Sequence, residues 1–349
     1  MAGKTDTSGY ETLRSRIKNK NLAGTYVFYG EEAYLRERTI EEMRQMAVPL
    51  SAESFNLNLF DSSVSPEDLA QAVNSLPMLC EYRVVIVRDV DLYKLQEGLQ
   101  RSFISILEDI PEYCVLIFVY DALPYKTDAR KKIHGVLKKH ALTVEFALND
   151  AARLVPWIKR HFKSEGLEIG TQDAQYLIFM VGRQMTGLLG EIGKLSAYST
   201  GGVITKDDID KVVVPGIEAE TFSLVRYICR GEHGKAFELL GQLFEQHTDA
   251  AAILGAIGWQ LRRIYTACLV RRGGGGIQKF MQVCPGMYSS SAKMTMQLAS
   301  AVSVDWCRSA LKACTETDLD SKTGGGGNEE LFELLVLKLI QEKVAHAED

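Results

Sequence analysis

The hydrophobic positions of the first 146 residues follow two alternating patterns. Short apolar runs rich in β-branched and aromatic residues predict buried strands over residues 25–29, 55–60, 83–88, 114–120 and 142–146. Between them, apolar residues recur at the spacing of amphipathic helices, over 33–48, 65–76, 92–110 and 126–139. Strands that are apolar throughout and separated by helices indicate a parallel sheet covered on both faces. This part of the chain is therefore predicted to be a doubly wound α/β domain.

The helix that begins at Ser65 carries a clear start signal. Ser65 is a preferred N-cap, Pro66 suits the first helical position, and Asp68 is placed to complete a capping box. The stripe that this helix is expected to bury consists of Leu69, Ala72, Val73 and Leu76.

After about residue 148 the strand patterns disappear. Amphipathic segments near 151–164, 171–182 and 188–198, with a short capped helix after Thr205, predict a small all-helical unit. Further helices are expected over 221–229, 234–246, 250–271, 293–301, 304–317 and 329–345. Two four-glycine runs, 273–276 and 324–327, are expected to be flexible connections. The pattern divides the chain into an α/β part (1–147), a small helical part (148–213) and a long helical part (214–349).

Composition narrows the class of protein. A length of 349 residues, with 46% hydrophobic and 24% charged residues, is typical of a globular chain of two or three domains. The net charge of -5 argues against a broadly basic surface that coats nucleic acid. No apolar run approaches the roughly 20 residues of a membrane span, and no signal pattern is present. The seven cysteines form no C-x-x-C pair, so we expect a reducing, cytoplasmic location without a disulfide framework or zinc site.

The turn after the first predicted strand lies where a P-loop protein carries G-x-x-x-x-G-K-[ST]. In such a loop the backbone surrounds the phosphates, the lysine reaches them and the Ser/Thr holds Mg²⁺. Aligned on Gly30, this sequence places Leu35 at the second glycine, Arg36 at the lysine and Glu37 at the Ser/Thr. Two further carboxylates, at residues 31–32, would repel a triphosphate.

The acid that would hold the metal is altered as well. The third strand ends in Val87-Arg88-Asp89, where an ATPase would carry Asp-Glu. Changes at both essential parts predict that this domain does not hydrolyse ATP, and no cofactor is expected. The alternative is an ordinary α/β domain without ATPase ancestry.

The sequence has no H-E-x-x-H, G-x-S-x-G or G-x-G-x-x-G motif, so it predicts no metal site and no catalytic residue. Asp121, after the fourth strand, lies where α/β enzymes often place a functional acid, but acidic residues commonly end strands, so its position does not by itself indicate a catalytic role.

Four motifs occur in a characteristic order along the whole chain. They are Gly30-Glu-Glu-x-Tyr-Leu35, Ser75-Leu-Pro-Met-Leu79 before Arg83–Asp89, Trp157-Ile158, and Asp320-x-Lys-Thr-Gly324. In this order they resemble the delta subunit family of the bacterial DNA polymerase III clamp loader. The resemblance implies an AAA+-like α/β domain with a degenerate nucleotide site, a small helical lid domain and a C-terminal helical collar domain that joins the loader subunits.

The same resemblance implies a function. Delta subunits are non-catalytic: they bind the sliding clamp (beta) and stabilise its open form for loading onto primed DNA, while ATPase subunits drive the cycle. Any nucleotidyltransferase activity belongs to the polymerase assembly. The implied partners are the clamp, the ATPase subunits and delta-prime through the collar, and primed DNA within the complex, with no membrane.

In the family, adjacent apolar residues after the second helix enter a pocket on the clamp, and the matching positions here are Met78 and Leu79. Pro77 cannot donate a hydrogen bond to the carbonyl of Val73, so the helix should end or kink there and let Met78 and Leu79 project outward with Leu76 and Pro77 beside them. The alternative is that Leu79, three residues after Leu76, continues the buried stripe.

Basic residues of the helix predicted over 126–139 are candidates for contacts with the DNA backbone; they include Lys126, Arg130, Lys131 and Lys132. The alternative is a solvated helix face. Two other functions stay open at this point: an active AAA+ NTPase or DNA-remodelling enzyme with an atypical phosphate loop, and a binding adaptor unrelated to replication.

Overall fold

The computed structural model describes residues 8–285, 287, 289–324 and 328–345. Contacts divide the chain into two compact units, one up to Asn149 together with Gln184–Thr186, the other made of Asp150–Arg183 and Gly187 onward. The sequence predicts three parts, with boundaries at 147/148 and 213/214. Because the contacts define only two units, the three-part division stays a prediction. Each unit is described by itself.

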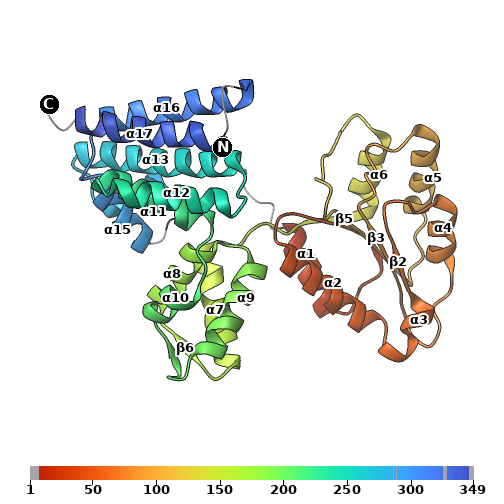
Figure 1. Cartoon of the computed structure of the whole chain (residues 1–349). Coiled ribbons are helices and arrows are strands. Elements are labelled where there is room, and N and C mark those ends of the chain that lie inside the picture. The colour runs from red at the N-terminus through yellow and green to blue at the C-terminus, as the bar shows by residue number, and fades with distance from the viewer. Residues whose placement is uncertain (1–7, 286, 288, 325–327, 346–349) are drawn as a thin grey trace. The chain divides into compact units, whose positions relative to one another are not determined.

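A five-stranded parallel sheet forms the centre of the first unit (Figure 1). Its strands lie in the order β2-β3-β4-β1-β5, and their bounds are β1 (Gly24–Tyr29), β2 (Leu57–Phe60), β3 (Arg83–Arg88), β4 (Cys114–Val119) and β5 (Ala141–Glu145). Every neighbouring pair is parallel. The predicted doubly wound α/β arrangement is confirmed.

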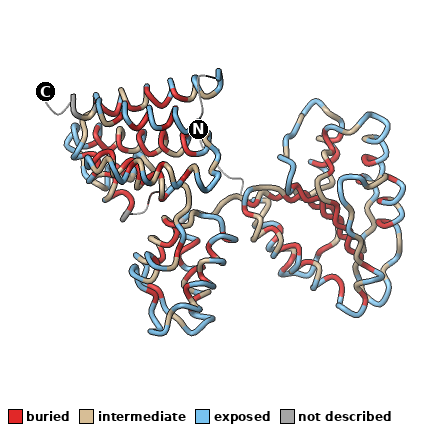
Figure 2. The backbone as a smooth tube through the Cα atoms, in the orientation of Figure 1, coloured by how far each residue is buried: buried red, intermediate tan, exposed pale blue. Residues whose placement is uncertain are grey.

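Helices cover both faces of this sheet. Alternate strand residues point to opposite faces, so Val85 and Val87 pack in one apolar core while Val84 and Ile86 pack in another. The first core contains residues of α4 (Pro66–Asn74), α5 (Glu97–Glu108) and α6 (Lys132–His140). The second contains residues of α1 (Ser8–Lys18) and α2 (Ala33–Ala47). Figure 2 shows the buried strands of the sheet between helices whose outer faces are exposed; β1, β3 and β4 are buried along most of their length, whereas the edge strands β2 and β5 are not.

Several predicted bounds in this unit need correction. Helix α1 was not expected, because only Leu13 and Ile17 of its residues are buried and the apolar pattern is short. The second strand begins at Leu57, not at residue 55, because a one-turn 3-10 helix, η1 (Leu50–Ala52), leads into α3 (Glu53–Asn56). Helix α5 begins at Glu97 instead of 92. Helix α6 begins at Lys132 instead of 126, since Asp128 holds a turn by accepting the backbone N–H of Arg130 at 3.1 Å.

The second unit begins with four helices and a short strand pair. The helices are α7 (Ala151–Ser164), α8 (Thr171–Val181), α9 (Met185–Tyr198) and α10 (Lys206–Val212). Strands β6 (Glu168–Ile169) and β7 (Val203–Ile204) pair in parallel, so the expectation of an all-helical segment is wrong in this detail. Two-residue strands carry too few positions for a period-two pattern to show. Thr205 caps α10 in a full capping box with Asp208, as its sequence predicts.

The remaining helices of this unit share one apolar core (Figure 1). They are α11 (Ile217–Arg230), α12 (His233–Glu245), α13 (Ala250–Arg272), α14 (Ile277–Val283), α15 (Ser289–Leu298), α16 (Val304–Thr323) and α17 (Asn328–Ala345). Helix α13 packs against α11, α15 and α16. Helix α14 was not predicted, and α16 extends past its predicted end to Thr323, so the motif 320–324 forms its C-terminus.

The first four-glycine run is a hydrogen-bonded helix end, which corrects the expectation of a flexible connection. Gly273 is the C-cap of α13, and Gly276 is the N-cap of α14. Between them, Gly274 donates to the carbonyl of Arg271 at 2.9 Å and Gly275 to that of Val270 at 2.8 Å. In the second run, Gly324 ends α16 in the left-handed conformation that favours glycine. Residues 325–327 lie outside the described residues.

Candidate functional site

The turn after β1 can be formed only by glycine. Gly30 has a φ of +118°, and a Cβ atom added there would lie 2.4 Å from the carbonyl oxygen of Phe146. That same oxygen accepts the N–H of Glu32 at 2.8 Å, and α2 begins one residue later, at Ala33. The close approach ties the turn to the residue after β5, so its backbone is fixed on both sides.

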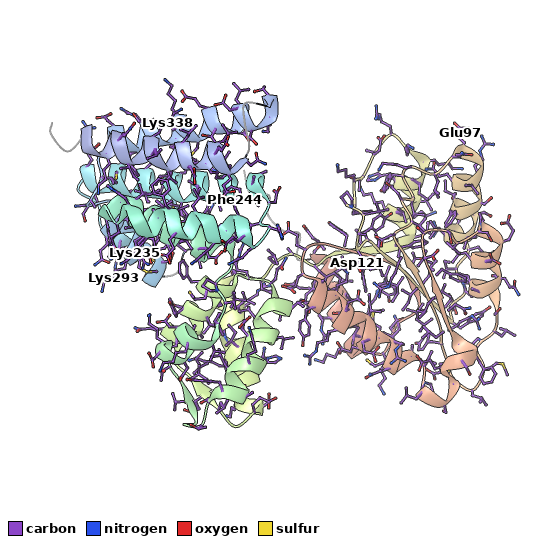
Figure 3. The ribbon with its side chains drawn as sticks, in the orientation of Figure 1. Glu97, Asp121, Lys235, Phe244, Lys293 and Lys338 are labelled. Atoms are coloured by element: carbon purple, nitrogen blue, oxygen red, sulfur yellow. The ribbon has the colours of Figure 1, made fainter. Side chains whose placement is uncertain are left out.

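Arg36, at the position of the P-loop lysine, is turned into the protein. Its side chain is 2% exposed. One terminal nitrogen, Nη1, donates to the carbonyl of Gly30 at 2.7 Å, and the other, Nη2, pairs with the carboxylate of Asp121. Asp121 follows β4 at its carboxyl end and is labelled in Figure 3. Both terminal nitrogens are therefore occupied by the chain's own oxygens, while the buried Nε lies 3.9 Å from the carboxylate of Glu37 without a hydrogen bond to any described residue.

A second arginine closes the same cluster of charges. Arg88, at the end of β3, makes two parallel hydrogen bonds to the carboxylate of Glu37, at 2.9 and 2.7 Å. It also lies 3.6 Å from the carboxylate of Asp121. The bonded carboxylate of Glu37 raises the pKa of Arg88, so this guanidinium stays charged. Together Arg36, Glu37, Arg88 and Asp121 form a network, here called the arginine–carboxylate cluster, that links α2 with the ends of β3 and β4.

Asp89 occupies an anion-binding arrangement of backbone groups beside this cluster. Its Oδ1 atom accepts three successive N–H groups, those of Asp121, Ala122 and Leu123, at 2.9, 2.9 and 3.0 Å. Consecutive N–H groups that converge in this way form an anion-binding concavity. Here the anion is the protein's own carboxylate, held by a residue whose φ is +56°.

Glu32 is the one member of the acidic pair 31–32 that lies inside the protein. It is 1% exposed, whereas Glu31 is exposed. Its carboxylate accepts the N–H of Met185, which the contact pattern groups with the first unit, at 3.3 Å. Burial raises the pKa of Glu32, because an ionised carboxylate loses solvation inside the protein.

Of the five residues predicted for a degenerate nucleotide site, the structure brings four together. Gly30, Arg36, Glu37 and Arg88 are joined through the bonds above, while Leu35 is half-buried against the core of the α1/α2 face. Sequence reasoning missed the part that Asp121 and Asp89 play. Asp121 pairs with a residue 85 positions away, which no local pattern could indicate.

The segment after α4, Leu76–Leu79, is here called the plug segment. Helix α4 begins as predicted, with the Ser65 hydroxyl accepting the N–H of Asp68 at 3.0 Å. It ends at Asn74, three residues before Pro77, and its C-cap residue Ser75 is extended, so the helix ends earlier than the predicted break at Pro77. Leu76 is therefore 72% exposed, and its expected burial with Leu69 is wrong.

Met78 and Leu79 project from the protein. They are 53% and 85% exposed, so the alternative in which Leu79 continues the buried stripe is wrong. Leu79 adopts a φ of +63°, a left-handed conformation that a residue with a branched γ carbon rarely takes. Both backbone polar groups of Met78 bond to the side chain of Asn56, in α3. Sequence reasoning did not single out Asn56.

The basic residues proposed for DNA contacts do not lie on one helix face. Lys126 and Arg130 precede α6, Lys132 is its first residue, and all three are exposed. Arg130 pairs with Asp128 at 2.9 Å. Lys131 is half-buried, and its ammonium group donates to the carbonyl of Tyr93. Lys126 and Lys132 are thus the two exposed lysines of this set.

Other kinds of site are not indicated by the part of the chain that the structure describes. No group of three or more His, Cys, Asp or Glu side chains there could hold a metal ion. All seven cysteines are free thiols, although the Sγ atoms of Cys268 and Cys307 lie 3.9 Å apart. Among the described helices, none combines the length and the apolar character needed to cross a membrane.

Two family models and two curated relatives give one family. Residues 26–147 match the family "DNA polymerase III, delta subunit", and residues 218–339 match its C-terminal domain. The DNA polymerase III subunit delta of Bacillus subtilis is 28% identical over 332 residues, which cover 93% of this chain and 95% of that protein. A probable delta subunit of Aquifex aeolicus is 22% identical over 266 residues, 74% of each chain. A solved structure of the Bacillus subtilis DNA clamp loader delta protein aligns at 25% identity with a TM-score of 0.49, covering 95% of this chain and 99% of that one.

Proposed function

The chain belongs to the family of DNA polymerase III delta subunits, and on this premise we propose that it is a non-catalytic clamp-loader subunit that binds the sliding clamp through its plug segment. The observation that carries the proposal is the exposure of Met78 and Leu79 on a segment outside the helix core. Two adjacent apolar side chains held in water are the kind of anchor that enters a pocket on a partner.

The size of this anchor fits a binding role. Full burial of a Met or Leu side chain contributes about 1.5–3 kcal/mol. Leu79 has nearly all of its surface available and Met78 about half. Their combined burial would contribute about 3 kcal/mol, which corresponds to about 100-fold in affinity. A subunit that binds the open clamp more tightly than the closed one would shift the ring toward the open form without hydrolysing ATP.

The arginine–carboxylate cluster supports a role without nucleotide hydrolysis. In a P-loop the lysine and the metal-binding acid must be free to meet phosphate and Mg²⁺. Here Arg36 is bonded to Gly30 and Asp121, and Asp89 is bonded to three backbone N–H groups. A nucleotide would have to displace these bonds and approach Glu37 and Asp121, which carry negative charge. The runner-up function, an active AAA+ NTPase with an atypical loop, needs all of these groups to rearrange.

One experiment tests the proposal directly. The full chain is titrated against the sliding clamp of its own organism, as wild type and as Met78→Ala/Leu79→Ala. We expect the double variant to bind about 100-fold more weakly. Leu99→Ala is the matched control, because Leu99 is a partly exposed apolar residue on α5, and it should leave the affinity unchanged. Equal binding by wild type and double variant would overturn the proposal and favour an adaptor role outside replication.

The same preparation tests the nucleotide prediction. A calorimetric titration of the wild-type chain with ATP and Mg²⁺ should show no binding in the micromolar range. A micromolar dissociation constant would contradict the non-catalytic role and support the NTPase alternative, whatever the clamp titration shows.

Contacts with the other implied partners are part of the proposal. Helices α11–α17 would pack against neighbouring collar helices and so join the ATPase subunits and delta-prime. For primed DNA we favour Lys126 and Lys132 over Arg130 and Lys131, since the latter two are already bonded within the chain. In the assembled loader, Lys126→Ala/Lys132→Ala should lower the slope of log affinity against log salt by about 2. An unchanged slope would place the DNA elsewhere.

A further inference from the structure

Asn56 connects the core of the first unit to the plug segment. It is fully buried at the end of α3. Its Nδ2 group donates to the carbonyls of Ala52 at 2.8 Å and of Met78 at 2.7 Å, and its Oδ1 atom accepts the N–H of Met78 at 2.7 Å. A single side chain therefore satisfies both backbone polar groups of a residue 22 positions away.

This set of bonds requires a carboxamide. Two donated bonds and one accepted bond match the two N–H groups and the carbonyl oxygen of Asn in number and kind. A carboxylate at the same place would keep the acceptor for the Met78 N–H but would set an oxygen against the carbonyls of Ala52 and Met78. A side chain without polar atoms would leave these backbone groups without their partner, and an unmet bond of this kind is costly when water is excluded.

The residue that follows this anchor is strained. Leu79 adopts a φ of +63°, which costs an L-residue about 1–2 kcal/mol. Because Leu79 is 85% exposed, its own burial does not repay that cost in the free chain. Such a conformation persists only where surrounding bonds fix it. The surrounding bonds are those of Met78 to Asn56, together with the Cys80 thiol, which lies 3.5 Å from the carbonyl of Met78 and 3.1 Å from that of Tyr82.

From this geometry we propose that Asn56 is a positioning residue, which holds the plug segment in its binding conformation before the partner arrives. The inference rests on the proposed function, because it assigns Asn56 a part in clamp binding although its own side chain is buried. A segment that is already ordered loses less conformational freedom on binding, so more of the burial of Met78 and Leu79 appears as affinity. The strain at Leu79 is then the cost of presenting both side chains outward.

The test compares two substitutions of the same chemistry. Asn56→Asp replaces the buried carboxamide, and Asn74→Asp is the control, because the exposed Asn74 amide at the end of α4 donates only to the carbonyl of Ala70, at 2.9 Å. Asn56→Asp should weaken clamp binding about tenfold, and Asn74→Asp should not weaken it. In the free chain, exchange of the Met78 amide hydrogen should be slow in the wild type and fast in Asn56→Asp, while exchange in β3 stays unchanged.

A double-mutant cycle separates positioning from general damage. In the Met78→Ala/Leu79→Ala background, Asn56→Asp should cause no further loss of affinity, because no plug side chains are left to position. If β3 exchange shows that Asn56→Asp disrupts the unit, Asn56→Ala decides the question by the same measurements. Loss of binding in the Met78/Leu79 variant with unchanged binding in both Asn56 variants would overturn the positioning role alone. Unchanged binding in the Met78/Leu79 variant itself would overturn the proposed function.

Discussion

The turn after β1 and the plug segment after α4, both in the first unit, differ in whether their side chains are bonded within the chain or exposed to solvent. At the turn, the guanidinium of Arg36 points inward, and its two terminal nitrogens bond to Gly30 and Asp121. In the plug segment, apolar side chains point outward, with Leu79 85% exposed. The backbone shows the same contrast: a positive φ is carried by glycine at residue 30 and by leucine at residue 79.

This difference shows how a partner-binding surface can be recognised. A group whose bonds and contacts are satisfied within the chain has little to gain from a partner, whereas an exposed apolar group on a strained backbone has much to gain. The arginine–carboxylate cluster therefore has the properties of a structural element, although it lies where a P-loop protein binds nucleotide. The plug segment has the properties of a contact surface, although it lies in a loop with no recognisable catalytic chemistry.

The largest effect should come from removing the centre of the arginine–carboxylate cluster. Arg36→Met keeps much of the buried volume but leaves the Gly30 carbonyl without its bond and Asp121 with only the longer Arg88 contact. We expect the first unit to lose about 2–3 kcal/mol of stability, somewhat less than for a fully buried pair because Asp121 is 46% exposed. Clamp affinity per folded molecule should not change.

Stability of the first unit has to be measured by a probe within it. The three tryptophans, at 157, 259 and 306, all lie in the second unit, so their fluorescence would not report this loss. Amide hydrogen exchange in β1 and β3 does report it. If exchange in those strands were unchanged in Arg36→Met, the arginine–carboxylate cluster would not stabilise the first unit.

The sequence predicts those features of the turn and of α4 that depend on neighbouring residues in the chain. The run of β1, the glycine turn and α2 follow from hydrophobic spacing, and the cap at Ser65 follows from its residue type. Leu76 was misplaced because the helical spacing was continued past the true helix end at Asn74. The pairing of Arg36 with Asp121 and the bonds of Asn56 to Met78 join positions 85 and 22 residues apart. Such contacts depend on how the strands and helices pack, which a single sequence does not display.

A smaller effect, of opposite sign for stability and binding, should follow Leu79→Asn. Asparagine tolerates the left-handed conformation better than leucine does, and Leu79 contributes little buried surface to the free chain. The first unit should gain about 0.5–1 kcal/mol of stability. At the same time, clamp binding should weaken at least about tenfold, because an apolar side chain is replaced by a polar one.

Both quantities can be followed on one preparation, by exchange in β3 and by clamp titration. His247→Asn is a matched control, since His247 also has a positive φ, of +54°, and lies in the second unit. It should leave clamp affinity unchanged. A loss of stability in Leu79→Asn would mean that the leucine side chain supports the loop and that its positive φ costs the free chain little.

The smallest effect concerns the buried carboxyl of Glu32. Its substitution tests whether the negative charge at this position costs the first unit folding free energy. Burial raises its pKa, with the N–H of Met185 opposing that shift. A carboxyl whose pKa is higher in the folded than in the unfolded chain favours folding below the unfolded pKa, and this advantage is lost as the pH rises through the folded pKa. At neutral pH the buried charge is therefore a cost. Glu32→Gln should raise the stability of the first unit at pH 7 by about 0.5 kcal/mol, and the gain should shrink as the pH falls through the raised folded pKa. A loss of stability at pH 7 would show instead that the start of α2 needs a negative charge at this position.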